Sequence, residues 1–315
     1  MPPLVLVVTG PTATGKTAVG VRLAELLNGE VVSADSMQIY RGLVIGTAAP
    51  TPEETRGVPH HMVGCVSPTE PYSAARYVRE ASVCCDDILS RGRIPVIVGG
   101  TGLYIDSLLA GRDFAENGDG SLRRELSERY DAEGGESLLA ELRERDPESA
   151  ARLHPNDRKR IVRALEICRL TGSTITEHDR QSRLAPPRYD SVRAALSFSD
   201  RQKLYDRIDR RVDRMMERGL AEEVRKLLAL CPDGECTALQ AIGYKELAES
   251  FAVGGSLEEA ADRIRLASRR YAKRQLSWLR RDPDLHWILW DTEPDPERAA
   301  HEIAALYNRY RKEHP

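Results

Sequence analysis

The feature that most restricts how this chain can fold is a phosphate-binding loop near its start. An apolar run over Leu4–Val8 leads into the sequence GPTATGKT at residues 10–17, and a helical pattern begins at Ala18. The spacing G-x-x-x-x-G-K-[ST] between a strand and an amphipathic helix is typical of a P-loop, in which backbone N–H groups surround a phosphate. The pattern therefore predicts an α/β fold with a P-loop and a parallel sheet, and a di- or triphosphate ligand.

Each residue type in this loop has a physical role. The glycines permit backbone conformations and close approaches that a Cβ atom would block. Lys16 adds a positive charge, and the Thr17 hydroxyl is placed to bind a Mg²⁺ ion shared with the phosphates. We expect the phosphates to be bound by the whole run, which is Gly10, Pro11, Thr12, Ala13, Thr14, Gly15, Lys16 and Thr17.

The remaining sequence argues against a secreted protein, a membrane protein and a zinc or disulfide protein. The apolar opening is too short for a signal peptide and lacks basic residues before it, and no run approaches the length of a membrane span. We therefore expect a cytoplasmic protein with no membrane contact. The six cysteines show none of the C-x-x-C spacing of a zinc site or redox motif, so we expect free thiols.

The formal net charge of −3 hides a strong segregation of charge. Residues 113–150 carry twelve acidic and five basic side chains, whereas residues 263–281 carry eight basic side chains and no acidic one. Tyr271 and Trp278 are interspersed in the basic segment. Such a segment attracts polyanions, so we predict contact with nucleic acid there. A solvated helix face is the alternative.

Two further predicted strands are followed by candidate catalytic residues. Residues 30–33 lead to Asp35, and Ile94–Val98 leads to the glycine-rich segment 99–102, which contains Thr101. Because the carboxyl ends of parallel strands share one edge of the sheet, Asp35 should face the P-loop. Its carboxylate could accept a proton, hold a metal-bound water or cap the next helix. The second strand lacks the terminal acid of an ATPase and leaves room for another substrate beside Thr101.

A change of composition at Asp113 marks a second folding unit. Residues 113–120 have the composition of a linker, a helical pattern follows, and a strand pattern returns only at Val192–Phe198. The late run Trp287–Trp290 predicts a closing strand. We therefore predict a catalytic core of residues 1–112 and 199–315, interrupted by a helical insertion of residues 113–198.

Other local patterns leave more than one role open. The adjacent His60 and His61 favour packing or hydrogen bonding over metal binding. Arg160 and Arg163, three apart in the insertion, suit two contacts along a phosphate backbone. Arg211 and the arginine four residues before it lie beside an apolar stripe. They could reach a diphosphate or form surface ion pairs with aspartates one or two residues away.

Eight segments together carry a resemblance to a known family. In chain order they are GPTATGKT, SADSMQIYRGLVIGTAAP, GVPHHMV, GGTGLYIDSLL, DRKRIVRALEI, LYDRIDRRVDRM, AIGYKEL and RRYAKRQLSWLRR. Their order and spacing resemble the bacterial tRNA dimethylallyltransferases, also called tRNA isopentenyltransferases, over nearly the whole chain. SADS-x-x-IY-x-G and GGTGLY are more specific than the P-loop.

The resemblance implies a tRNA-modifying prenyltransferase. It would transfer a dimethylallyl group from dimethylallyl diphosphate to N6 of adenosine 37, next to the anticodon, in tRNAs that read codons starting with U, and release diphosphate. Asp35 would be the general base, and Thr101 would help to position the flipped adenosine. Lys16, Arg211 and Mg²⁺ at Thr17 would neutralise the diphosphate. The enzyme would act as a monomer.

The resemblance also implies tRNA contacts, with the helical insertion binding the anticodon stem-loop. The matching positions are Asp35, Ser36, Met37, Gln38, Thr101, Arg123, Lys159, Arg160, Ile161, Val162, Arg163, Gln240, Gly243, Tyr244 and Lys245. Two rival classes are a small-molecule or nucleoside kinase and a non-catalytic, GTPase-like RNA-binding module. A kinase has no use for the basic segment, and the sequence has no guanine-reading N-K-x-D stretch.

Overall fold

The computed structural model describes residues 2–314 apart from residues 113, 115–119, 185, 233 and 235. The chain divides into two units, one of residues 1–111 and 188–315 and the other of residues 112–187. The first unit is built on a parallel sheet, and the second is helical. The predicted fold class, a P-loop parallel-sheet core with a helical insertion, is therefore confirmed.

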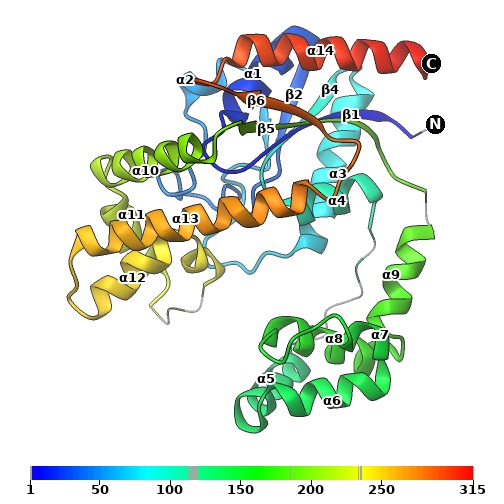
Figure 1. Cartoon of the computed structure of the whole chain (residues 1–315), viewed down its shortest axis with the longest axis vertical. Helices are drawn as coiled ribbons and strands as arrows, with labels where there is room; N and C mark the ends of the chain where they lie inside the picture. The colour runs from blue at the N-terminus through cyan, green and yellow to red at the C-terminus, as the bar shows by residue number, and fades with distance from the viewer. Residues whose placement is uncertain are drawn as a thin grey trace. The chain divides into compact units, whose positions relative to one another are not determined.

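Parallel strands form the sheet of the core in the order β3-β2-β4-β1-β5-β6. All of them except β3 are labelled in Figure 1. The strands are β1 (Leu4–Thr9), β2 (Gly29–Ser33), β3 (His60–His61), β4 (Ile94–Val98), β5 (Asp190–Phe198) and β6 (His286–Trp290). β1 lies between β4 and β5, and its side chains from Val5 to Val8 are fully buried. Continuous apolar runs of this kind are typical of parallel strands that are covered on both faces.

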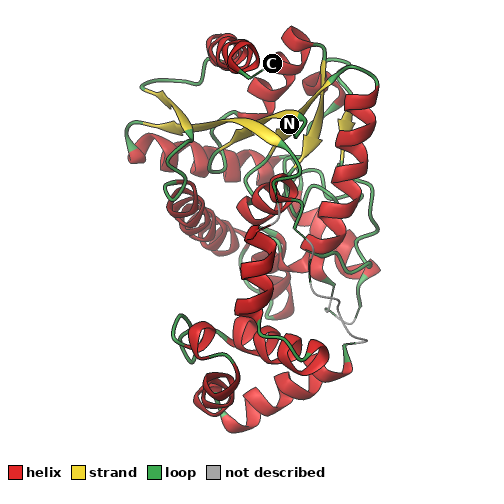
Figure 2. Ribbon diagram, turned by 90° about the vertical axis from the view of Figure 1, so that its right-hand side faces the viewer, coloured by secondary structure: helices red, strands yellow, loops and turns green. Residues whose placement is uncertain are grey.

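Helices cover both faces of the sheet (Figure 2). They are α1 (Lys16–Leu27), α2 (Pro52–Thr55), α3 (Ala74–Ser90), α4 (Gly102–Ala110), α10 (Arg201–Glu217), α11 (Leu220–Leu230), the 3₁₀ turn η1 (Thr237–Gln240), α12 (Tyr244–Ala252), α13 (Leu257–Leu279) and α14 (Pro296–Glu313). α1 packs against α14, and α10 packs against α13. One hydrophobic cluster joins both pairs to the sheet and includes Leu23 of α1, Leu196 of β5 and Leu276 of α13.

The insertion has a hydrophobic core of its own. Its helices are α5 (Ser121–Glu133), α6 (Gly135–Arg145), α7 (Pro147–Ala150), α8 (Arg158–Thr171) and α9 (Ile175–Leu184). Leu126, Leu138, Leu142 and Leu165 are fully buried in one cluster. Because this apolar surface is buried within the insertion, the unit does not depend on the sheet for its own packing.

The insertion is shorter than its predicted extent of residues 113–198. Residues 190–198 form β5, which pairs in parallel with the whole of β1, so this stretch belongs to the core. The strand pattern at Val192–Phe198 was recognised, but the partners of β5 lie far away in the sequence. Asp190 accepts a hydrogen bond from a tyrosine of α14 at 2.8 Å, and Arg193 forms an ion pair with Asp282. These partners become visible only in the folded chain.

The insertion leaves and re-enters the core at one place. The Tyr189 N–H donates a hydrogen bond to the Leu109 carbonyl at 3.1 Å. A Cβ atom at Gly111 would lie 2.8 Å from the Cβ of Arg188. The two connections are therefore adjacent on the surface of the core.

The adjacent histidines of β3 have hydrogen-bonding roles, as predicted. His60 Nδ1 lies 2.8 Å from the carbonyl oxygen of Val58. His61 Nε2 lies 2.7 Å from Glu30 Oε2. Each ring has its own partner within the protein, so the pair supports the edge of the sheet.

Two further findings concern the chain as a whole. In the part that the structure describes, no helix is both long and apolar enough to cross a membrane. The six cysteines are free thiols, as expected.

Candidate active site

A cavity of about 530 Å³ lies at the carboxyl edge of the sheet, within the core unit. Its wall is formed by the P-loop after β1, the turns after β2 and β4, one face of each of α10 and α13, and residues 240–242. Ligands of parallel α/β sheets bind at this edge. The cavity is therefore the candidate active site.

The P-loop is held in a conformation that favours glycine. Gly10 has φ +142°, and a Cβ atom there would lie 2.3 Å from the Leu196 carbonyl oxygen. Gly15 has φ +87° and begins α1, and no described side chain caps it. The first N–H groups of α1 can therefore donate to a bound anion. Residues 12–17 line the cavity, whereas Gly10 and Pro11 are not among its lining residues.

Two other residues hold the P-loop from outside. The Arg207 Nε–H donates a hydrogen bond to the Ala13 carbonyl at 3.1 Å, and the same guanidinium pairs with Glu293. The Trp290 indole N–H donates a hydrogen bond to the Thr14 carbonyl at 3.1 Å. The loop is therefore fixed before a ligand arrives.

Lys16 and Arg211 bring two cations to the same part of the cavity. The Lys16 ammonium donates a hydrogen bond to the Pro11 carbonyl at 2.7 Å. Burial, together with the nearby Arg211 guanidinium, lowers the pKa of Lys16 to about 8. Burial also lowers the pKa of Arg211, and no carboxylate of the described residues forms an ion pair with it. Arg211 is therefore available to a diphosphate and forms no surface ion pair with a described residue, whereas Arg207 does form one, with Glu293.

Asp35 lines the cavity. One of its carboxylate oxygens accepts hydrogen bonds within the protein, and the other accepts none from the described residues. Its Oδ1 accepts hydrogen bonds from the Met37 N–H at 2.9 Å and the Gln38 N–H at 3.4 Å. No described residue donates a hydrogen bond to Oδ2. The capping role and a proton-accepting role are therefore compatible, because each can use a different oxygen.

Thr101 lies beside Asp35 because β2 and β4 are neighbours in the sheet. The Ser36 N–H donates a hydrogen bond to Thr101 Oγ1 at 3.2 Å. A Cβ atom at Gly99 would lie 2.2 Å from the Ala34 carbonyl oxygen, so the approach of the two turns requires glycine. The turns that carry the two predicted catalytic residues are thus adjacent, and of the two residues Asp35 lines the cavity.

Sequence reasoning missed two site residues of α13. Gln275 accepts a hydrogen bond from the Thr12 N–H at 3.0 Å and donates one to the Gly100 carbonyl at 2.8 Å, which ties the P-loop to the turn after β4. Tyr271 lines the cavity, and burial together with the Asp35 carboxylate raises its pKa to about 12. Gln275 could have been found in the sequence because it is a polar residue among the apolar positions that form the buried face of α13.

Part of the cavity lining is apolar. It contains Val98, Ile208, Val212, Met215, Ile242 and Ile264. The lining thus includes both cations and apolar side chains, so the cavity suits a ligand with a charged head and a short hydrocarbon part.

Several predicted tRNA contacts of the core line the same cavity, namely Ser36, Met37, Gln38 and Gln240. The Gln38 amide is used within the protein. It accepts a hydrogen bond from the Ser33 hydroxyl at 2.9 Å and donates one to the Ala48 carbonyl at 3.2 Å. Gln38 therefore supports the wall of the cavity, whereas the Gln240 side chain is exposed.

Tyr244 has a structural role in the core. Its side chain is fully buried, and its hydroxyl donates a hydrogen bond to Glu223. The same carboxylate accepts hydrogen bonds from the three consecutive N–H groups of residues 44–46. Of the neighbours Gly243 and Lys245, the glycine is buried and the lysine is exposed. A tRNA contact here is thus open to Lys245 but not to the ring of Tyr244.

In the insertion, two of the predicted arginines share one carboxylate. Arg123 lies 2.8 Å and Arg163 lies 2.7 Å from Glu166 Oε2. Glu166 of α8 is 1% exposed, so it fixes the guanidinium groups of Arg123 on α5 and Arg163 on α8. Fixed arginines lose less entropy when they bind phosphate.

The four residues that precede Arg163 on α8 differ in burial. Lys159 and Arg160 are exposed. Ile161 and Val162 are buried in the core of the insertion, where helical spacing places them beside Leu165. The prediction of tRNA contacts is therefore corrected for these two side chains, and only their backbone could reach a ligand.

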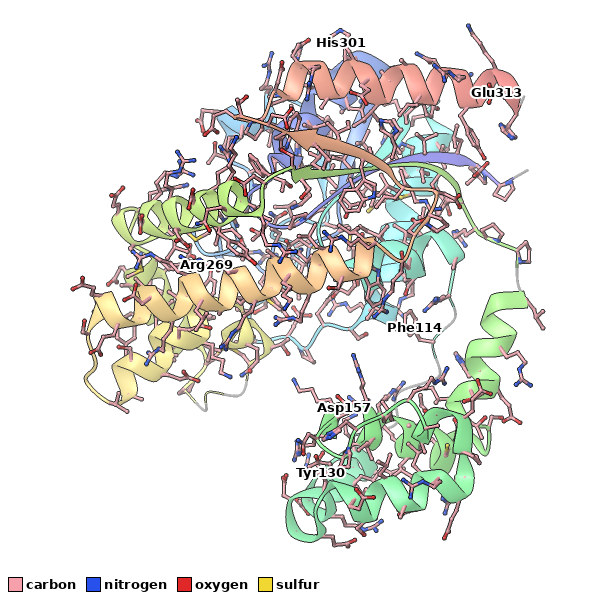
Figure 3. The ribbon with its side chains drawn as sticks, viewed as in Figure 1. Phe114, Tyr130, Asp157, Arg269, His301 and Glu313 are labelled. Atoms are coloured by element: carbon pink, nitrogen blue, oxygen red, sulfur yellow. The ribbon has the colours of Figure 1, made fainter. Side chains whose placement is uncertain are left out.

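The basic segment 263–281 is partly neutralised within the core. Arg269, labelled in Figure 3, donates a hydrogen bond to Asp209 at 2.9 Å, and Arg265 pairs with Asp213. Both aspartates belong to α10, so these pairs join α10 to α13. The exposed cations of the segment include Arg270, Lys273, Arg280 and Arg281.

Comparison with known proteins agrees with this geometry. A family profile described as IPP transferase matches residues 38–282, and one described as isopentenyl transferase matches residues 3–62. The tRNA dimethylallyltransferase of Acetivibrio thermocellus is 42% identical over 295 residues, which cover 93% of this chain and 94% of that protein.

Solved structures are also similar over almost the whole chain. The tRNA isopentenylpyrophosphate transferase of Bacillus halodurans has a TM-score of 0.73 and 39% identity, and the match covers 99% of this chain and 98% of that one. A eukaryotic dimethylallyltransferase, described as acting on tRNA, has a TM-score of 0.83 and 30% identity, covering 99% of this chain and 80% of that one. The chain therefore belongs to the IPP transferase family, the family of the tRNA dimethylallyltransferases.

Proposed function

We propose that this protein transfers a dimethylallyl group from dimethylallyl diphosphate to N6 of adenosine 37 in tRNAs that read codons starting with U. The observation that carries the proposal is one cavity that combines an anion site, a carboxylate and apolar side chains. The P-loop with Lys16 and Arg211 suits the diphosphate, the apolar side chains suit the five-carbon group, and Asp35 suits the attacking amine. The names of the relatives support the same reaction.

The reaction forms one bond and breaks another. The N6 nitrogen attacks C1 of the dimethylallyl group, and the bond between C1 and the bridging oxygen breaks, so its electron pair leaves with the diphosphate. The open Oδ2 of Asp35 takes the proton that N6 loses. Lys16, Arg211 and the P-loop N–H groups stabilise the charge that develops on the leaving diphosphate.

The site fits a Mg²⁺ ion that is held mainly by the substrate. Thr17 lines the cavity, and its hydroxyl has no hydrogen-bond partner among the described residues. In the described part of the chain, no cluster of three or more His, Cys, Asp or Glu side chains could hold a metal. One hydroxyl plus phosphate oxygens meets the preference of Mg²⁺ for few protein ligands. When bound, the ion would supply further neutralisation of the diphosphate.

The tRNA has to present its adenosine outside the base stack, because a stacked adenine cannot enter the cavity. We assign the anticodon stem-loop to the insertion, where Lys159 and Arg160 are exposed at the start of α8. In this proposal the enzyme acts as a monomer in the cytoplasm.

A transfer assay tests the proposal directly. The protein is mixed with radiolabelled dimethylallyl diphosphate, Mg²⁺ and unmodified tRNA in which adenosine 37 is followed by two more adenosines. Label should enter the tRNA, and replacement of adenosine 37 by guanosine should prevent it. Transfer of phosphate from ATP to a small acceptor, with no labelled tRNA, would instead favour a kinase.

The variant Asp35→Asn separates catalysis from binding. Asparagine keeps an oxygen for the Met37 and Gln38 N–H groups but cannot take the proton from N6. We expect turnover to fall by about 10²-fold or more, while the Kd for tRNA stays near that of the wild type. Single-turnover kinetics and filter binding measure the two quantities. Wild-type turnover in the variant would show that Asp35 is not the base.

A further inference from the structure

α10 presents a row of arginines that extends beyond the diphosphate site. Arg207, Arg211, Arg214 and Arg218 all line the cavity. Residues three or four apart in this way lie on one face of a helix. At a rise of 1.5 Å per residue, Arg214 lies about 4.5 Å and Arg218 about 10 Å beyond Arg211 along the helix axis. The row thus leads from the diphosphate site to the end of the helix.

The outer two arginines lack the partners that other arginines of the helix have. Arg214 and Arg218 are exposed, and no carboxylate of the described residues forms an ion pair with either. On the same helix, Arg207 and Arg210 both pair with Glu293. Asp209 and Asp213 of α10 pair with arginines of α13. Arg214 and Arg218 are therefore available to bind an anionic ligand.

The cavity wall carries more cations than carboxylates. The cations that line it are Lys16, Arg207, Arg211, Arg214, Arg218 and Arg274, and the carboxylates are Asp35 and Glu54. Glu54 already accepts a hydrogen bond from the Thr51 N–H in its own helix cap. Arg214 lies close enough to Arg211 to lower its pKa further, although burial is the main cause. A second anion would relieve this repulsion.

The tRNA of the proposed function supplies such anions. A flipped adenosine stays attached to its strand, so its flanking phosphates must lie at the mouth of the cavity that receives its base. We propose that Arg214 and Arg218 bind the RNA backbone phosphates that flank the flipped adenosine. They act as positioning residues for the adenosine and contact none of the reacting atoms. This inference rests on the proposed function.

The variant Arg214→Ala/Arg218→Ala tests the inference. The Kd for an unmodified anticodon stem-loop RNA is measured by filter binding at several KCl concentrations. Each contact with a phosphate of single-stranded RNA contributes about 0.7 to the slope of log K against log salt, so the slope should fall by about 1.4. The Kd should rise about tenfold or more at low salt. The KM for dimethylallyl diphosphate at saturating RNA should stay unchanged.

Two further variants serve as controls. Arg309→Ala/Lys312→Ala removes the same charge from exposed positions of α14 that do not line the cavity, and the RNA slope should not change. Arg214→Lys/Arg218→Lys keeps two point charges and should restore most of the slope. Thermal unfolding followed by circular dichroism should give the wild-type Tm for all three variants, because every changed side chain is exposed.

The possible failures are distinguishable. A raised KM for dimethylallyl diphosphate with an unchanged RNA slope would assign the two arginines to the donor and overturn the inference. An unchanged slope with an unchanged KM would overturn it too, since the side chains would then be only solvated. If the wild-type enzyme binds RNA but never labels it, the proposed function fails, whatever the variants do.

Discussion

At the scale of single residues, Lys16 shows how burial prepares a binding group. Its pKa is lowered to about 8 because its surroundings disfavour the charged form before an anion arrives. An unfolded lysine has a pKa of about 10.4. Between these values the unfolded chain binds more protons than the folded one, so the charged Lys16 destabilises the fold below pH 8 and stability rises with pH through this window. A bound diphosphate should favour the charged form again.

Donor binding should therefore take up a proton. We expect uptake of close to one proton per dimethylallyl diphosphate at pH 9 and much less at pH 7, where Lys16 is already charged. Isothermal titration calorimetry in two buffers of different ionisation enthalpy measures the uptake. Lys16→Met should abolish it, and Lys226→Met, at an exposed position outside the cavity, should not. If Lys16→Met and Lys226→Met take up the same number of protons on binding the donor, the proton goes to a group other than Lys16.

Site residues were predictable where their role is local in the chain. The P-loop follows from one continuous motif, and Asp35 and Thr101 follow from the strands that they terminate. Gln275 was not predictable because it acts on Thr12, 263 residues away. Ile161 was assigned to tRNA through a motif, although the apolar stripe of its own helix places its side chain in the core.

At the scale of elements, Glu30 joins the edge of the sheet to its surroundings. It lies on β2 and is 2% exposed. Arg91 at the end of α3, Arg93 before β4 and His61 on β3 all bind its carboxylate. The Arg91 guanidinium, with His61 and Arg93, holds the pKa of Glu30 well below its usual range. The stabilisation by Glu30 is therefore fully present above a pH of about 4.3, the unfolded pKa, and is lost as the pH falls toward the folded pKa.

Glu30→Gln should lower the free energy of unfolding by about 2 kcal/mol at pH 7, since a hydrogen-bonded charge is lost. The difference from the wild type should shrink at pH 3.5, because protonation weakens the wild-type interactions as well. Urea unfolding at both pH values measures this. Glu217→Gln, at an exposed position of α10, should have little effect at either pH. If wild type and Glu30→Gln differ by the same free energy of unfolding at pH 7 and pH 3.5, the charge of Glu30 does not cause the stabilisation.

The strands were also predicted unevenly, for a physical reason. β1, β2, β4 and β6 begin and end within one residue of the predicted limits, because their apolar runs are continuous. For β5 the strand pattern was recognised only from Val192 on, and the segment was assigned to the insertion. Asp190 and Arg193 find partners on α14 and beyond α13, and no local pattern shows such partners.

At the scale of the whole molecule, the two units have separate cores and adjacent connections. Replacement of residues 112–187 by four glycines should therefore leave a core that unfolds cooperatively and binds dimethylallyl diphosphate with a Kd near that of the full chain. The Kd for tRNA should rise about tenfold or more, since the phosphate contacts of the insertion are lost. Calorimetry and filter binding test the two parts. Unchanged tRNA affinity would place the RNA site in the core.

The position of β5 also governs the order in which the protein takes shape on the ribosome. β1 is made first, but β5, its neighbour in the sheet, is made only after the whole insertion. Until then one edge of β1 exposes unpaired N–H and C=O groups, while the insertion can already fold on its own core. α10 and α13, which carry Arg211 and Gln275, are made later still. The nascent chain thus holds a P-loop from its earliest residues yet acquires a donor site only when its synthesis is almost complete.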